Sequence, residues 1–332
     1  MKRNDTNTSA TMPPQLTVAA SPHEKTRTHV PHLMRAVLIA LLPACLFGAV
    51  WFGPRAALVC VTSVLFCMLA EALYQCLLHR PVTVRDGSAA VTGLLLALNL
   101  PYTIPFPMLL LADLFAIIVV KQLFGGLGKN IVNPALAGRV FLFISFPGAM
   151  AAYPVRADFS TPYADAVASA TPLAALKEGS LGAHTLSDLF FGTVGGCIGE
   201  VSALLLLLGG VYLLCRRVIT WHIPVSYLGT VALLTFLFPR TGDRVESMLL
   251  ELCAGGLLLA AFFMATDYVT SPVTRRGRLI YGVLCGAITV LIRYCGAYAE
   301  GVSFAVLICN LLVYYIDCFT RPTPFGKKGG RS

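Results

Sequence analysis

Charged side chains are scarce in this sequence. Asp, Glu, Lys and Arg make up 12% of its 332 residues, whereas hydrophobic residues make up 57%. An average soluble domain is about one-quarter charged. A chain this apolar could not cover its surface with polar groups in water, because a folded chain of this length still exposes a large area. The composition therefore excludes a water-soluble enzyme and indicates an integral membrane protein.

Two further absences narrow the chemistry. The eleven cysteines include no C-x-x-C pair, a spacing by which one chain commonly ligates zinc or an iron–sulfur cluster. The net charge of +9 is not arranged as a basic stripe with interleaved aromatics, which a nucleic-acid site would need. Most Lys and Arg lie in short loops between apolar segments, as in membrane proteins. We therefore expect no nucleic-acid partner and no metal site within this chain.

What the sequence does contain is a series of ten apolar segments. A helix needs about 20 apolar residues to cross a bilayer. The segments are 33–52, 56–78, 87–100, 106–124, 133–148, 197–215, 223–239, 247–266, 279–293 and 302–319. The third and fifth are short and bounded by Pro101, Pro134 and Pro147, so we expect them to be tilted, broken or partly re-entrant. The predicted fold is an all-α integral membrane bundle of about ten transmembrane helices.

The positive charges orient these segments. If the N-terminus is cytoplasmic, the inside segments hold eighteen Lys and Arg and the outside segments hold six. This excess has the expected sign, so both termini are predicted to be cytoplasmic. The chain then divides into a disordered tail, a first transmembrane half, an extracytoplasmic loop, a second half and a cytoplasmic tail. Their bounds are 1–20, 21–147, 148–186, 187–320 and 321–332. Five segments per half are compatible with two inverted halves.

The extracytoplasmic loop contains a short motif, DAVASATPL, at residues 165–173. Longer blocks accompany it in the two halves, at 121–130, 133–139, 264–274, 277–282 and 300–305. In content and order these blocks resemble the NqrB/RnfD family, the membrane subunit that Rnf electron-transport complexes share with sodium-pumping NADH:quinone reductases. The resemblance covers nearly all of the chain after residue 20.

This resemblance implies a covalent flavin. In the family, a flavin transferase esterifies FMN through its phosphate to the threonine of a D-x-x-[ST]-G-A-T segment. That places FMN on Thr171, with Asp165, Ser169 and Ala170 as motif context, although this chain has Ala168-Ser169 where the family has Ser or Thr followed by Gly. The alternative is an ordinary loop threonine. The family also points to a second, non-covalent flavin, riboflavin.

The resemblance further implies a role and partners. The chain would be a flavin-carrying subunit, not catalytic alone, of a translocase in the bacterial inner membrane. It would relay electrons between ferredoxin and NAD and couple them to Na⁺ or H⁺ movement. Iron–sulfur subunits, a second flavin subunit and membrane lipid would be its partners. Two alternatives stay open: a secondary transporter with inverted halves and no redox cofactor, and a membrane scaffold without redox function.

Ionisable residues inside predicted spans are costly and therefore informative. Glu71 and Asp113 lie deep in the second and fourth segments, which makes them candidates for a Na⁺ or proton path. The alternative is that they form ion pairs, for example with Arg139.

Two polar positions at predicted segment ends also allow alternatives. Asn133-Pro134 is either a plain turn or the start of a helix whose first amides favour an anion. Asp267 is either a helix cap or part of a polar wall for a second cofactor. We expect the plain turn and the cap.

Overall fold

The computed structural model describes residues 29–151, 172–177, 185–192, 194–200, 202–296 and 300–322. Every regular element in these ranges is helical, and they contain no strand. Helix is the expected state in lipid, because each segment then satisfies its own backbone N–H and C=O groups. The predicted all-α class is confirmed for these residues.

The helices fall into two sets, one on each side of the long loop. The first set is α1 (Val30–Phe52), α2 (Pro54–Leu77), η1 (Val84–Asp86), α3 (Ser88–Leu98), α4 (Phe106–Leu114), η2 (Phe115–Gln122), α5 (Pro134–Ser145) and α6 (Pro147–Ala151). The second set is α7 (Pro172–Lys177), α8 (Leu186–Phe191), α9 (Ala203–Cys215), α10 (His222–Leu237), α11 (Arg244–Cys253), α12 (Leu257–Leu259), η4 (Ala260–Met264), α13 (Arg275–Cys295) and α14 (Val302–Thr320). Each of the ten apolar segments contains at least one helix.

Only some of these helices are long enough to span a bilayer unaided. In the described part of the chain, α1, α2, α13 and α14 are long and apolar enough. A fifth span results if α11 and the Leu257–Met264 helix, bent by 63°, are taken as one. Helices α3, α5, α9 and α10 are apolar but have 10–17 residues. A multi-pass membrane protein with four or five candidate spans is therefore confirmed, whereas the ten-helix bundle and its inverted halves stay predictions.

The third apolar segment is short, as expected, and the chain beyond it is irregular. Helix α3 ends at Leu98, and the carbonyls of Leu98 and Leu100 accept hydrogen bonds from the amides of Gly199 and Ile198, at 2.8 and 3.1 Å. A Cβ on Gly199 would lie 2.6 Å from the Leu98 side chain, so this close backbone approach requires glycine. Irregular backbone from one half is thus satisfied by irregular backbone from the other.

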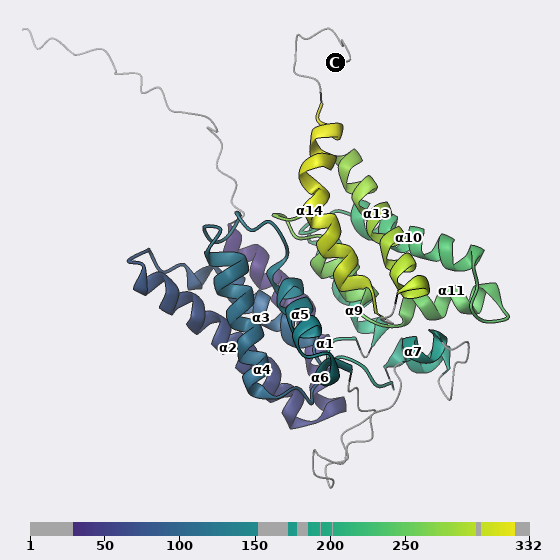
Figure 1. Cartoon of the computed structure of the whole chain (residues 1–332), viewed down its shortest axis with the longest axis horizontal. Coiled ribbons are helices and arrows are strands. Elements are labelled where there is room, and N and C mark those ends of the chain that lie inside the picture. The colour runs from purple at the N-terminus through teal and green to yellow at the C-terminus, as the bar shows by residue number, and fades with distance from the viewer. Residues whose placement is uncertain are drawn as a thin grey trace, which may run out of the picture.

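The two sets of helices lie beside one another in Figure 1, with α2, α3 and α4 toward one side and α10, α11 and α13 toward the other. Helix α1 packs on α9, and α5 packs on α14, which joins the sets. The interior is mostly Leu, Ala, Val and Phe, but six charged side chains are also buried in the described ranges. They are Glu71, Asp113, Lys121, Arg139, Glu251 and Arg293.

Candidate functional site

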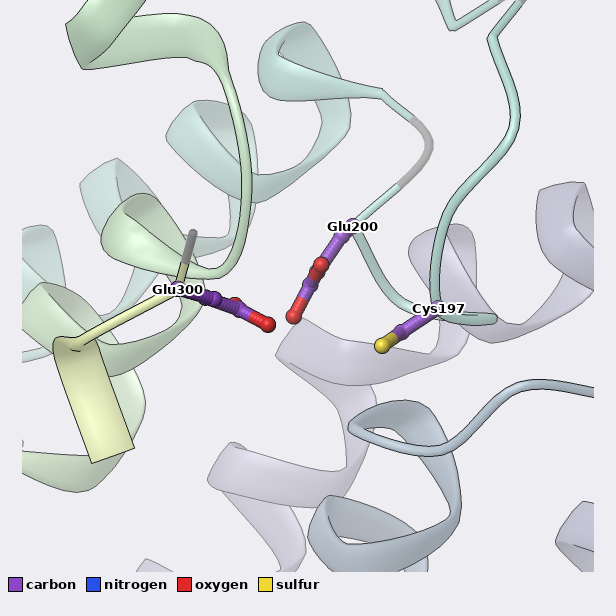
Figure 2. Close-up of side chains that lie close together, drawn as sticks. All are labelled: Cys197, Glu200 and Glu300. Carbon is purple, nitrogen blue, oxygen red and sulfur yellow. The ribbon is translucent and has the colours of Figure 1, made fainter. Parts of the chain in front are cut away.

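The first site is an arginine-centred cluster between the two sets of helices. Arg139 lies on α5, and its side chain is 3% exposed. Figure 2 shows Cys197, Glu200 and Glu300 pointing toward one another from separate segments. The Arg139 guanidinium donates to Asn99 Oδ1 at 2.7 Å and to Glu200 Oε1 at 3.3 Å. It also pairs with Glu300 and lies 3.6 Å from Cys197 Sγ.

The donor set of this cluster could in principle hold a metal ion, because the ligand atoms of Cys197, Glu200 and Glu300 lie within 4.8 Å of one another. The guanidinium of Arg139, however, already contacts all three residues. Two carboxylates facing one arginine leave one negative charge when both are ionised. One proton or one monovalent cation would neutralise the cluster, which is how a buried ion group avoids an uncompensated charge.

A second buried cluster supports the bend after α11. Arg293 on α13 donates to Glu251 Oε2 at 2.8 Å and to the backbone carbonyls of Glu251 and Ala254 at 2.6 and 3.0 Å. Arg240 also pairs with Glu251, at 3.1 Å. An arginine that satisfies the last carbonyls of a helix stabilises its end. We assign this cluster a structural role at the α11–α12 bend.

Glu71 forms an ion pair, but its partner is Lys121 rather than Arg139. The Lys121 ammonium on η2 lies 2.8 Å from Glu71 Oε1 and donates to Ser88 Oγ at 2.7 Å. Gln122 donates to the same carboxylate oxygen at 2.6 Å. The other oxygen, Glu71 Oε2, is buried and has no hydrogen-bond partner among the described residues. The suggested pairing with Arg139 was therefore wrong, because Arg139 is held by Glu200 and Glu300.

Asp113 has a different environment. Its Oδ1 accepts hydrogen bonds from Ser63 at 2.7 Å and from the Cys67 thiol at 3.3 Å, and its Oδ2 is buried without a partner in the described chain. No Lys or Arg forms an ion pair with it in the described ranges. A buried carboxylate without a cation is too costly to stay ionised alone. Asp113 therefore needs a bound proton or a bound cation.

The residues around these two carboxylates form a stripe that sequence reasoning missed. Ser63, Cys67, Glu71 and Gln75 are all buried on α2. They are spaced four residues apart, so they share one face of the helix. That face contacts α4 and η2. The four-residue spacing was visible in the sequence, but Ser, Cys and Gln are common enough in membrane helices to give a weak signal.

A cavity opens beside this stripe, at the end of the molecule where the predicted orientation places the cytoplasm. The cavity and its open mouth enclose about 780 Å³ of empty space. Its apolar wall includes Val91, Leu95, Phe262 and Phe263. Its polar wall includes Ser88, Thr92, Lys121, Asn130, Asn133, Thr266 and Asp267. The cavity thus combines apolar surfaces with a few polar side chains, the usual make-up of a small-molecule site.

The structure decides the alternatives left open for Asn133 and Asp267. Asn133 caps α5, because its Oδ1 accepts from the amides of Ala135 and Leu136; the expected plain turn was wrong. The expected cap at Asp267 was also wrong, since Thr274 caps α13. Asp267 accepts from Thr270 Oγ1 at 3.1 Å and lines the cavity. Burial raises the pKa of the Asp267 carboxyl above its ordinary value.

The predicted flavin attachment point, Thr171, lies outside the described residues, as do Asp165, Ser169 and Ala170. The next helix along the chain, α7, is described. Its Leu173 and Leu176 are buried in an apolar cluster with Leu189, Val194, Leu250 and Ala254.

This cluster adjoins the arginine-centred site. A Cβ on Gly255 would lie 3.5 Å from Leu173 and 3.7 Å from Glu300 Oε1. The residues directly after Thr171 are thus anchored near the arginine-centred cluster.

Known proteins resemble this chain along nearly its whole length. A family model described as the NQR2, RnfD, RnfE family matches residues 17–326. The RnfD-type subunit of the Na⁺-translocating ferredoxin:NAD⁺ oxidoreductase complex of Acetobacterium woodii is 45% identical over 94% of this chain and 95% of that protein. Its proton-translocating counterpart from Clostridium ljungdahlii is 41% identical over 94% and 96%. The corresponding subunit of the ion-translocating oxidoreductase complex of Citrobacter koseri is 35% identical over 94% and 99%.

Proposed function

The chain belongs to the NQR2, RnfD, RnfE family, and on that premise we propose that it is the RnfD-type subunit of an ion-translocating ferredoxin:NAD⁺ oxidoreductase complex. One observation carries this proposal: subunits of such complexes match the chain nearly end to end, at 45% and 41% identity. The chain would sit in a bacterial inner membrane with both termini in the cytoplasm. Iron–sulfur subunits and a second flavin subunit would be its partners, because no sequence motif here supports iron–sulfur or NAD chemistry.

The first part of this function is a covalent FMN on Thr171. Two observations support it: the motif at residues 165–173, and the anchoring of α7, the helix directly after Thr171, by two buried leucines. Such a link would hold the flavin on a short tether at the extracytoplasmic face. A flavin bound there supplies one-electron and two-electron transfer. A flavin transferase would have to act on the chain first.

The test of this attachment uses in-gel fluorescence of denatured protein co-expressed with a flavin transferase. We expect a fluorescent band in the wild type and none in Thr171→Ala. Thr161→Ala is the matched control, because Thr161 is also followed by proline in the same loop, and it should keep the band. Mass spectrometry of the peptide containing Thr171 should show the added FMN. Fluorescence that survives Thr171→Ala would overturn the assignment.

The second part is a non-covalent flavin, riboflavin by analogy with the family, in the cavity beside α2. The residues present fit such a ring. Phe262 and Phe263 offer apolar surface, and Lys121, Asn130 and Asp267 offer charged or hydrogen-bonding groups. A flat aromatic ring with polar edges requires this combination. The cavity residues would bind the ring and set its polarity.

The test of the second flavin is extraction of the purified Thr171→Ala protein, followed by chromatography of the released pigment. We expect one non-covalent flavin per chain. Val91→Trp, which fills the cavity from α3, should release it, whereas Val225→Trp, at an exposed position on α10, should not. A chain without flavin in both measurements would favour the secondary-transporter alternative, which requires no chromophore.

The third part is ion movement. Glu71 and Asp113 each have a buried carboxylate oxygen without a partner in the described chain, and the Arg139 cluster has two carboxylates for one guanidinium. These groups lie at different positions along the bundle, as stations of a Na⁺ or H⁺ path would. Exchange of Na⁺ for K⁺ in proteoliposomes containing the whole complex tests the ion. Transport that stops without Na⁺ indicates sodium, and transport that continues and responds to protonophores indicates protons.

A further inference from the structure

The ion pair between Glu71 and Lys121 forms the boundary between the cavity and the membrane interior. The Lys121 side chain lines the cavity, together with Ser88. Glu71 lies behind Lys121 and is 1% exposed. The ammonium uses two of its three donors on Glu71 Oε1 and Ser88 Oγ, at 2.8 and 2.7 Å. One positive charge therefore faces the carboxylate on one side and the cavity on the other.

Glu71 depends on Lys121 for its charge. Its Oε1 accepts from Lys121 and Gln122, and its Oε2 has no partner in the described chain. Helix α3, which also packs on α2, has no titratable side chain. The other titratable or charged groups on elements packed against this part of α2 are Asp113 on α4, Asp86 and Arg85 on η1, His32 and Arg35 on α1, and Cys67, Tyr74 and Cys76 on α2 itself. None of these cations is paired with Glu71 in the described structure.

We propose that Glu71 takes up one proton when one negative charge is placed in the cavity, so that the Lys121–Glu71 pair couples reduction there to proton binding inside the membrane. The inference rests on the proposed flavin in the cavity. One electron, from a reduced iron–sulfur protein in the complex or from dithionite in a test, adds one negative charge. One proton from water binds Glu71. The total charge of the buried region is then unchanged.

The physical reason is competition for one cation in a low-dielectric environment. Attraction between charges is strong where water is excluded, so a new anion in the cavity attracts the Lys121 ammonium. The ammonium then compensates Glu71 less well. A buried carboxylate that loses its cation is more stable in its neutral form. Glu71 is therefore protonated in the reduced state and ionised in the oxidised state.

A route for the proton is present on the same face of α2. Gln75 follows Glu71 by one turn and is buried. It exchanges hydrogen bonds with Thr83, at 2.8 and 2.9 Å, and Thr83 is exposed. In the other direction, Cys67 and Asp113 continue the stripe toward the middle of the bundle. Glu71 thus lies between the aqueous surface and the second buried carboxylate.

The test is reduced-minus-oxidised infrared difference spectroscopy on the full chain in detergent. The Thr171→Ala background ensures that only non-covalent flavin is reduced. We expect the C=O stretching band of a protonated carboxylic acid to appear on reduction. The band should be lost in Glu71→Gln and kept in Glu246→Gln, which removes an exposed carboxylate on α11. It should also be lost in Lys121→Met, because Glu71 without its cation is protonated in both states.

The outcomes separate this inference from the proposed function. Flavin content is measured in every sample. A wild type without non-covalent flavin overturns the cavity assignment, and the inference with it. A flavin-containing wild type without the band, or a flavin-containing Glu71→Gln with an unchanged band, overturns the inference alone. If Glu71→Gln does not fold, Glu71→Asp must keep the band at a shifted frequency, and an unshifted band contradicts the proposal.

Discussion

The buried charges on the two sides of this bundle are compensated in different ways. Near the cavity, one lysine pairs with one carboxylate, Lys121 with Glu71, and both come from the first set of helices. Near the extracytoplasmic loop, one arginine serves two carboxylates, Glu200 and Glu300, which come from the second set. The first arrangement is neutral when both groups are ionised, whereas the second is not. The Arg139 cluster therefore holds the two halves together, and the Lys121 pair is the one that a charge in the cavity can disturb.

The largest expected effect is from removal of the shared cation. Arg139→Met should lower the free energy of unfolding by about 3–5 kcal/mol, because it leaves two buried carboxylates without a cation. Thermal melting of the purified chain in detergent measures the loss. Arg276→Met, at an exposed position on α13, is the control and should change stability little. Equal melting temperatures for the two variants would show that the cluster does not join the halves.

A smaller effect is expected from the lysine pair. Lys121→Met should destabilise the chain by about 3 kcal/mol, because Glu71 is left buried and unpaired. Glu71→Gln in the same chain should restore most of that loss, since no buried charge is then left. A double-mutant cycle, measured by melting in detergent, gives the coupling between the two residues. Additive losses would contradict the ion pair.

A third effect concerns the packing that brings α3 to the stripe on α2. A Cβ on Gly93 would lie 2.7 Å from the backbone oxygen of Ser63, so Gly93→Ala must push the two helices apart. Overpacking of this kind typically costs about 1–3 kcal/mol. Gly229→Ala, where no atom lies within 4 Å of the added Cβ, is the matched control on α10. A melting temperature equal to that of the control would show that the contact is not tight.

The smallest effect on stability is expected at Asp113. Asp113→Asn is neutral and keeps the oxygen that accepts from Ser63 and Cys67, so stability should change by less than about 1 kcal/mol. Ion transport by the complex should nevertheless fall sharply, because an amide cannot bind and release a proton. Melting and transport are measured on the same preparation. A large loss of stability would instead indicate that Asp113 is ionised and bound to a cation.

Several features were predictable because they depend on local sequence. The ten apolar segments all contain helices, since apolar length and proline position act within one segment. The shortness of α3 followed from Pro101 in the same way. Even where the expectation was wrong, at Asn133, a local signal was present: Asn before Pro is a recognised start of a helix. The attachment motif was also read locally, and Thr171 stays a prediction.

The sequence by itself therefore determined that this chain is helical and lies in a membrane, and it exposed Glu71, Asp113 and Arg139 as unusual. Only the tertiary structure decided their partners. Arg139 meets residues 40 to 161 positions away, and the cavity is lined by residues from Leu33 to Val269. Hydrophobic burial and helix caps act over a few residues, but an ion pair between helices depends on how those helices rotate and cross. That information is carried by packing across the whole bundle.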